Sequence, residues 1–81
     1  MISSAQCRAA RSLLDWSQQK LADEAGVGIV TVRQLEAGTH RPRRATLQVV
    51  RQCLEAAGVE FIDENGGGVG VRLRGLQRRN R

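Results

Sequence analysis

The chain has 81 residues, of which 41% are hydrophobic and 26% are charged, and its only aromatic residues are Trp16 and Phe61. This length fits one domain with a modest core, which dimerisation would help to stabilise. So few rings argue against a stacking platform for single-stranded nucleic acid. No apolar run is long enough to span a bilayer and the N-terminus does not resemble a signal peptide, so we expect a cytoplasmic protein without a membrane segment.

The net charge of +5 is unevenly distributed along the chain. Residues 1–58 carry a net charge of +3, residues 59–71 one of −3, and residues 72–81 one of +5. All but one of the cationic residues are Arg, whose planar guanidinium donates two hydrogen bonds at once to a phosphate or a guanine. This composition favours a polyanionic partner.

Four helices are predicted in the first 58 residues, from apolar side chains at helical spacing and from short breaks between the segments. The first is capped by Ser3 or Ser4 and runs to about residue 14. The second begins after Ser17 and ends at residue 25, before Gly26. The third and fourth are expected at about residues 28–37 and 45–57.

The pattern then changes from helical to alternating, which predicts a β-hairpin. Apolar residues on one face of its strands are Val59, Phe61, Val69, Val71 and Leu73, and the turn lies at residues 63–68. Two strands cannot bury such a face alone, so we expect it to pack on the first and fourth helices or against its copy in a second subunit. Residues 74–81 are basic and poor in apolar side chains, which predicts a disordered tail that contacts phosphates or only solubilises the protein.

The predicted third helix follows the second after a tight Gly-Val-Gly turn, as in a unit that fits the major groove of DNA. With about 100° of rotation per residue, Val32 and Leu35 face the core, whereas Val30 and Gln34 point the opposite way. The residues that flank this outer face are Ile29, Thr31 and Arg33.

The stretch from residue 16 to residue 42 resembles the motif of the phage-repressor and Cro-like helix-turn-helix family of Xre-type regulators. The matching residues, in register and without a gap, are Ser17, Gln18, Leu21, Ala22, Gly26, Val27, Thr31, Val32, Leu35, Glu36, Gly38 and Pro42. The resemblance covers residues 5–58 and implies a compact helical domain that binds double-stranded DNA, usually as a dimer on a two-fold operator. The predicted fold class is therefore all-α: a four-helix phage-repressor-like domain (1–58), a short C-terminal β-hairpin (59–73) and a basic tail (74–81).

Residue roles follow from the resemblance and from the outer face of the third helix. Base readout is assigned to Ile29, Val30, Arg33 and Gln34, and phosphate contacts are assigned to Gln18, Thr31, Arg41, Arg43 and Arg44. Arg11 and Glu36 match a structural ion pair of the family, which ties the first helix to the end of the third. Many relatives have polar residues at the positions of Ile29 and Val30, so apolar contact with thymine methyl groups is the route left to these two side chains.

Neither an enzyme nor a metal or cofactor site is predicted, because the chain has no catalytic His–acid or Cys–His pairing and no metal-ligand spacing. Cys7 and Cys53 lie on apolar stripes and are interpreted as buried thiols, with a redox sensor as the alternative. His40 lies in the loop before Pro42, where it could contact a phosphate. Trp16 is expected in the core at the corner between the first two helices.

These observations together predict a transcriptional regulator that binds double-stranded DNA sequence-specifically, as a homodimer, with its third helix in the major groove. Two alternatives stay open. One is an antitoxin-like or partner-binding regulator, whose hairpin and tail engage another protein. The other is a non-specific nucleic-acid-binding protein that uses its arginine tail.

Overall fold

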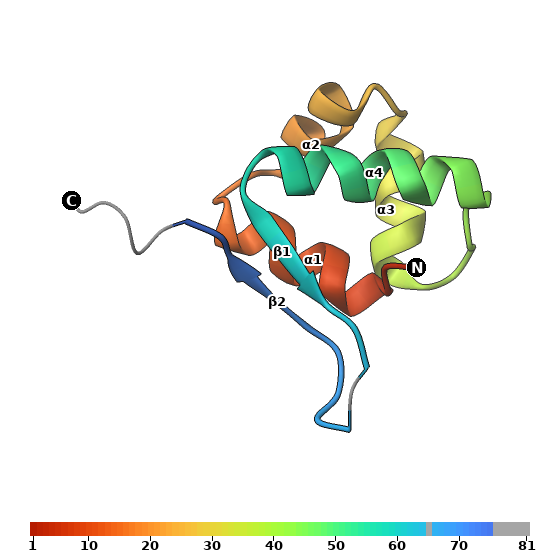
Figure 1. The fold of residues 1–81 in the computed structure, drawn as a ribbon. Helices are drawn as coiled ribbons and strands as arrows, with labels where there is room; N and C mark the ends of the chain where they lie inside the picture. The colour runs from red at the N-terminus through yellow and green to blue at the C-terminus, as the bar shows by residue number, and fades with distance from the viewer. Residues whose placement is uncertain (65, 76–81) are drawn as a thin grey trace.

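The structure, a computed structural model, describes residues 1–64 and 66–75. Its elements are α1 (Ser4–Leu13), α2 (Gln18–Ala25), α3 (Ile29–Ala37), α4 (Arg44–Ala56), β1 (Val59–Ile62) and β2 (Gly70–Leu73). Figure 1 shows the hairpin lying in front of α1, with its tip extending beyond the helices. The prediction of four helices followed by one hairpin is confirmed, and each helix boundary lies within one residue of its expected position.

Local sequence signals explain where the helices begin and end. The Ser3 hydroxyl accepts a hydrogen bond from the Gln6 N–H, and the Gln6 side chain accepts one from the Ser3 N–H, which forms a capping box at α1. The Ser17 hydroxyl caps the first turn of α2. Gly26 and Gly38 follow α2 and α3 with φ of 70° and 72°, a left-handed conformation that residues with a Cβ rarely adopt.

The core lies between the four helices and beneath the hairpin. Its buried apolar residues are Ile2, Cys7, Ala10, Leu21, Ala22, Val32, Leu35, Leu47, Val50, Leu54, Val59 and Phe61. Trp16 is half-buried and packs against this cluster, as expected. None of the helices in the described residues has the length and hydropathy that a membrane span requires.

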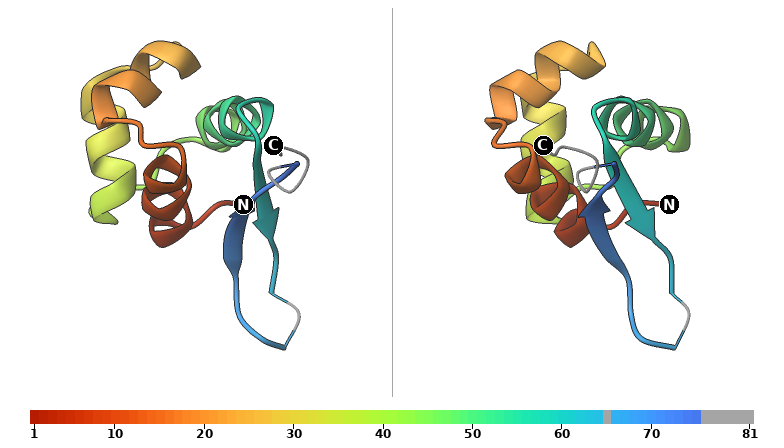
Figure 2. Two further views of the ribbon diagram at one scale, coloured as in Figure 1. Left: turned by 90° about the vertical axis from the view of Figure 1, so that its left-hand side faces the viewer. Right: turned by 60° about the vertical axis from the view of Figure 1, so that its left-hand side comes forward.

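The hairpin is antiparallel, with Val59 opposite Leu73 and Phe61 opposite Val71. These four side chains pack on the core, β2 mainly against α1 and β1 against α4 (Figure 2). The hairpin therefore lies on α1 and α4, which is one of the two placements that the sequence left open.

One buried amide joins the hairpin to α1. The Nε2 atom of Gln6 donates to the carbonyl oxygens of Ile62 and Gly70, at 3.3 and 3.1 Å, while its Oε1 accepts from Ser3. Ile62 and Gly70 face each other at the end of the ladder next to the tip. A single side chain thus caps α1 and holds the end of the sheet, a role that sequence analysis did not assign.

The expected position of Val69 on the inner face of the hairpin is wrong. Val69 precedes β2, and its side chain is 52% exposed. The cause lies in the tip, where the Glu64 carboxylate accepts hydrogen bonds from the N–H groups of Gly66 and Gly68. This arrangement extends the turn, so the ladder begins one residue later than the alternation suggests.

The predicted start of the disordered tail is also wrong. The Arg74 N–H donates to the Gly58 carbonyl at 2.6 Å, and the Arg74 guanidinium donates to the Glu55 carbonyl at 2.8 Å. Arg74, the first residue of the predicted tail, is therefore held against the end of α4 and the start of the hairpin, although β2 itself ends at Leu73 as expected. Residues 76–81 of the predicted tail lie outside the described residues.

Candidate nucleic-acid interface

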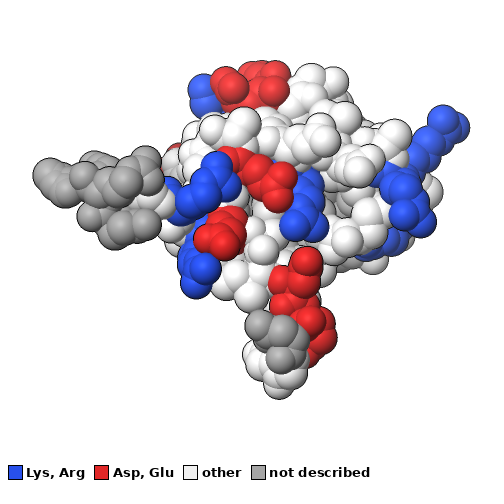
Figure 3. All heavy atoms as spheres, in the orientation of Figure 1, with Lys and Arg blue, Asp and Glu red and all other residues white. Residues whose placement is uncertain are grey.

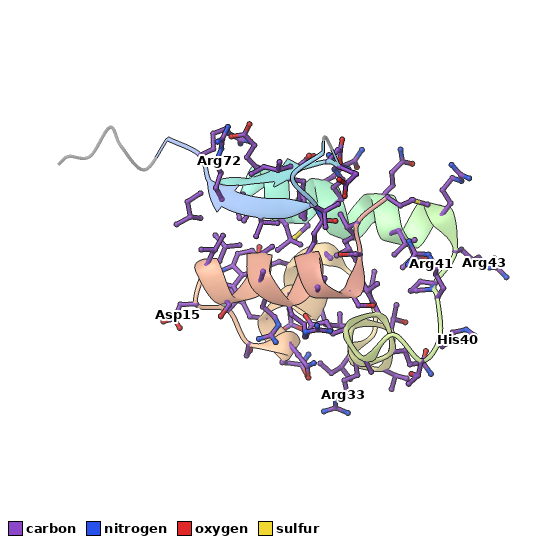
Figure 4. All side chains as sticks on the ribbon, turned by 90° about the horizontal axis from the view of Figure 1, so that it is seen from below. Asp15, Arg33, His40, Arg41, Arg43 and Arg72 are labelled. Carbon is purple, nitrogen blue, oxygen red and sulfur yellow. The ribbon has the colours of Figure 1, made fainter. Side chains whose placement is uncertain are left out.

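α3 presents one face away from the protein interior. Val32 and Leu35 are buried in the core, whereas Val30 is 57% exposed and Arg33 is exposed. Figure 4 shows Arg33 pointing away from the rest of the molecule, on the opposite side of α1 from Arg72 in the hairpin. The predicted inward positions of Val32 and Leu35 and the outward position of Val30 are confirmed. Gln34, expected to point straight outward, is instead half-buried, and Arg33, expected on the flank, is exposed.

The other residues assigned to the α3 face differ in exposure. Ile29 is half-buried and packs against the core, so it offers only part of its side chain outward. Thr31 and Gln34 are half-buried on the flank, where they line a hollow of about 220 Å³. The loop and the start of α4 form the rest of the lining, through His40, Pro42, Arg43 and Thr46. A polar concavity with an arginine at its side suits a phosphate oxygen.

The loop between α3 and α4, together with the first residue of α4, carries three arginines within four positions. Arg41, Arg43 and Arg44 are all exposed, and Arg41 also donates to the Ile2 carbonyl at 3.3 Å. Arg43 is the N-cap residue of α4, and no side chain caps this helix. Its first N–H groups therefore lie beside two guanidinium groups, and both favour an anion.

The basic side chains of this region have no acidic partner. Within the described residues, Arg33, Arg43 and Arg44 form no ion pair and no hydrogen bond. The only acid between residues 25 and 54 is Glu36, which is 3% exposed. Figure 3 shows Lys and Arg gathered at the end of the molecule where this loop lies, and acidic side chains at the tip of the hairpin. The α3–α4 region is therefore a surface of uncompensated positive charge.

The expected ion pair between Arg11 and Glu36 is present and is the centre of a larger network. Arg11 donates to both carboxylate oxygens, at 2.8 and 2.9 Å. Gln18 donates to the same carboxylate at 3.0 Å, and the Cys7 thiol lies 3.5 Å from it. Arg8 donates to the Glu36 backbone carbonyl. The network joins α1, α2 and the C-terminal half of α3, and so fixes the position of the exposed face.

This network shifts the pKa values of its members. Burial alone would raise the pKa of Glu36, but the hydrogen bonds from Arg11 and Gln18 outweigh it and hold the pKa below its ordinary value. Burial, followed by the charge of Glu36, raises the pKa of the Cys7 thiol to about 12. Burial also raises the pKa of the half-buried Cys53. Both shifts keep the thiols protonated, which does not favour a redox sensor.

The side-chain amide of Gln18, assigned to phosphate, faces inward toward Glu36 through its nitrogen. Its backbone lies in the first turn of α2, whose N-cap is Ser17. The structure thus gives Gln18 a second role, since it connects the start of α2 to the end of α3. Sequence analysis could not assign this role, because only the crossing of the helices brings the two residues together.

Comparison with known proteins identifies the family. A family model described as helix-turn-helix matches residues 8–62, which covers all of α2, α3, α4 and β1. No curated protein matches the chain. The match contains the exposed α3 face, the arginine loop and the Arg11–Glu36 pair. The chain belongs to the Cro/C1-type, Xre-like helix-turn-helix family of DNA-binding transcription regulators.

Proposed function

We propose that the protein binds double-stranded DNA sequence-specifically, with α3 in the major groove, and regulates transcription as a homodimer. The observation that carries this proposal is the set of unpaired arginines Arg33, Arg43 and Arg44 around an exposed helix face. Unpaired cations bind phosphate without first giving up an intramolecular partner, and they release counterions from DNA.

The proposed roles divide along the surface. Arg33 and Gln34 read base edges by hydrogen bonds, while Val30 and the outer part of Ile29 contact thymine methyl groups. Thr31, Arg41, Arg43 and Arg44, together with the first turn of α4, hold phosphates and set the register. Gln18 contributes a phosphate contact at the start of α2. Base contacts lie on α3 and phosphate contacts surround it, as in other helix-turn-helix proteins.

Selection of duplexes from a random library by the purified protein tests the proposal. The affinity for a selected duplex is compared with that for a shuffled duplex of equal length and composition, at several salt concentrations. We expect the selected duplex to bind at least about 1,000-fold more tightly. With about five phosphates contacted, log K should fall with log salt at a slope of roughly −4 to −5.

Each contrary result has a defined meaning. Equal affinity for selected and shuffled duplexes would show non-specific binding and remove the base-reading role of α3. Failure to retain any duplex at low ionic strength would contradict DNA binding altogether. A slope near zero would mean that the arginine loop does not contact phosphates.

A further inference from the structure

Val30 is the most exposed large apolar side chain that the structure describes. It is 57% exposed and faces away from Val32 and Leu35, which are buried in the core. A single exposed valine is ordinary on a protein surface. This one, however, lies on the face of α3 that carries Arg33, within the surface of uncompensated positive charge. If DNA covers this face, the base edges determine what Val30 contacts.

The first part of α3 cannot read bases through hydrogen bonds from its side chains. Residues 27–30 have the sequence Val-Gly-Ile-Val and carry no polar side chain. Ile29 packs partly on the core, and Thr31 is half-buried on the flank, where it lines the hollow beside the loop. Val30 is thus the side chain that this end of the helix presents outward, and it offers only methyl groups.

Arg33 follows Val30 by three positions on the exposed side of α3. Its guanidinium has no partner among the described residues and points away from the rest of the molecule (Figure 4). Side chains three positions apart on a helix have Cβ atoms about 5–6 Å apart, which is less than two base-pair steps of about 3.4 Å. When Arg33 donates to a guanine, Val30 therefore lies over a base pair within about two steps of it.

A valine at this place distinguishes bases by one feature, the methyl group at C5 of a pyrimidine. In the major groove thymine displays this methyl group beside O4, whereas cytosine displays an amino group and no methyl. The valine side chain forms no hydrogen bond, so it gains from the methyl group whichever exocyclic group stands beside it. 5-Methylcytosine carries the same methyl group as thymine. Because valine keeps one preferred rotamer on a helix, it loses little freedom in the contact.

We propose that Val30 reads the C5 methyl group of a pyrimidine near the guanine that Arg33 binds, and that the affinity of the protein for DNA therefore depends on cytosine methylation. Thymine and 5-methylcytosine are favoured at this position, while uracil and cytosine, which lack the methyl group, bind more weakly. The inference deepens the proposed function and rests on it, because it names the chemical group that the same face of α3 recognises.

The first experiment changes the DNA. Each thymine of a selected duplex is replaced in turn by deoxyuridine, which removes the methyl group and keeps the base pairing. At the position that Val30 contacts, we expect the affinity to fall about fourfold, the effect of one buried methyl group. This position should lie within about two base pairs of the guanine whose recognition is lost in Arg33→Ala. When a cytosine–guanine pair takes its place, C5 methylation of the cytosine should raise the affinity about fourfold.

A matched pair of valine variants assigns the effect to one side chain. Val30→Ala removes two methyl groups from the protein and should reduce the effects of deoxyuridine and of 5-methylcytosine to less than about 1.5-fold. Val49→Ala is the control, since Val49 is also exposed but lies on α4, and both effects should stay about fourfold. Thermal unfolding followed by circular dichroism checks that both variants fold.

Several outcomes would overturn the inference. If no deoxyuridine weakens binding to the wild type, or if C5 methylation fails to raise the affinity, the methyl group is not read. If Val30→Ala responds to deoxyuridine like the wild type, the methyl group acts through DNA shape or through another side chain. An equal reduction in Val49→Ala would remove the assignment to Val30. Failure of the proposed function appears differently, because selected and shuffled duplexes then bind equally or no duplex is retained.

Discussion

Two groups of basic residues in this small domain use their charge differently. Four residues on different elements each pair with a glutamate: Arg11 on α1, Lys20 on α2, Arg51 on α4 and Arg72 on β2. Around α3 and the following loop, Arg33, Arg43 and Arg44 have no partner among the described residues. In the first group, Arg11 and Arg72 join neighbouring elements, whereas Lys20 and Arg51 pair within their own helices. The second group leaves its charge to a ligand.

This difference separates folding from binding at the level of single side chains. Loss of a buried, paired charge leaves its partner uncompensated and destabilises the fold. Loss of an exposed, unpaired arginine changes little within the protein but removes a contact with phosphate or guanine. Mutations in the buried Arg11–Glu36 pair and in the unpaired arginines should therefore give opposite results in unfolding and DNA-binding experiments.

The largest change in stability is expected from Glu36→Ala. This variant removes the acceptor that Arg11 and Gln18 share at the junction of three helices. We expect the free energy of unfolding to fall by about 3 kcal/mol, measured by urea denaturation. The matched control is Glu24→Ala, which breaks the exposed pair with Lys20 and should cost less than about 0.5 kcal/mol. Equal losses in the two variants would contradict the importance of the network.

Arg33→Ala should affect DNA binding next most strongly. A guanidinium that reads a guanine through two hydrogen bonds contributes about 1–3 kcal/mol of discrimination, which corresponds to roughly 5- to 150-fold in affinity for a selected duplex. Stability should stay within about 0.5 kcal/mol of the wild type, because the side chain has no partner. A loss of equal size on selected and shuffled duplexes would show that Arg33 contacts phosphate instead.

Arg43→Ala and Arg44→Ala should have smaller effects that are the same for every sequence. Each variant removes about one phosphate contact, so the slope of log K against log salt should become less negative by about 0.9. The measurement is a salt titration of binding to a selected and a shuffled duplex. A change confined to the selected duplex would assign these residues to base readout.

The smallest change in stability is expected when only the pH is lowered, from pH 6 to pH 4. Because the folded pKa of Glu36 lies below its ordinary value of 4.5, the stability that its ionised form contributes is complete above that value and is lost as pH falls through the folded pKa. Unfolding by urea should therefore need less denaturant at pH 4 than at pH 6. Glu36→Gln keeps the shape of the side chain and should show a shallower dependence; an unchanged dependence would assign the effect to other carboxylates.

The helices were predictable because their ends depend on local chemistry. Ser3, Ser17, Gly26 and Gly38 mark caps that act within one turn, so their sequence positions fix the boundaries. The exposed face of α3 followed from helical geometry, and the Arg11–Glu36 pair from family resemblance. Both are properties of short segments or of a known motif.

The details that sequence analysis missed depend on contacts between distant segments. The alternation of residues 69–73 reads as one strand, but the tip held by Glu64 delays the ladder to Gly70. Besides capping α1, the Gln6 side chain donates hydrogen bonds to the hairpin, to residues more than fifty positions away in the sequence. The Ser3–Gln6 spacing could have revealed the capping box, but not the sheet that this amide also holds.

Cys7 gives the domain an internal reporter of its own motion. Its thiol is fully buried, with a pKa of about 12, so alkylating reagents that require an accessible thiolate reach it only when the surrounding helices separate. Its rate of labelling in otherwise native protein therefore measures how often this region opens. Duplex that binds the α3 face should slow the labelling, because it stabilises the closed form. The rate of Cys7 alkylation therefore reports both local opening and DNA binding.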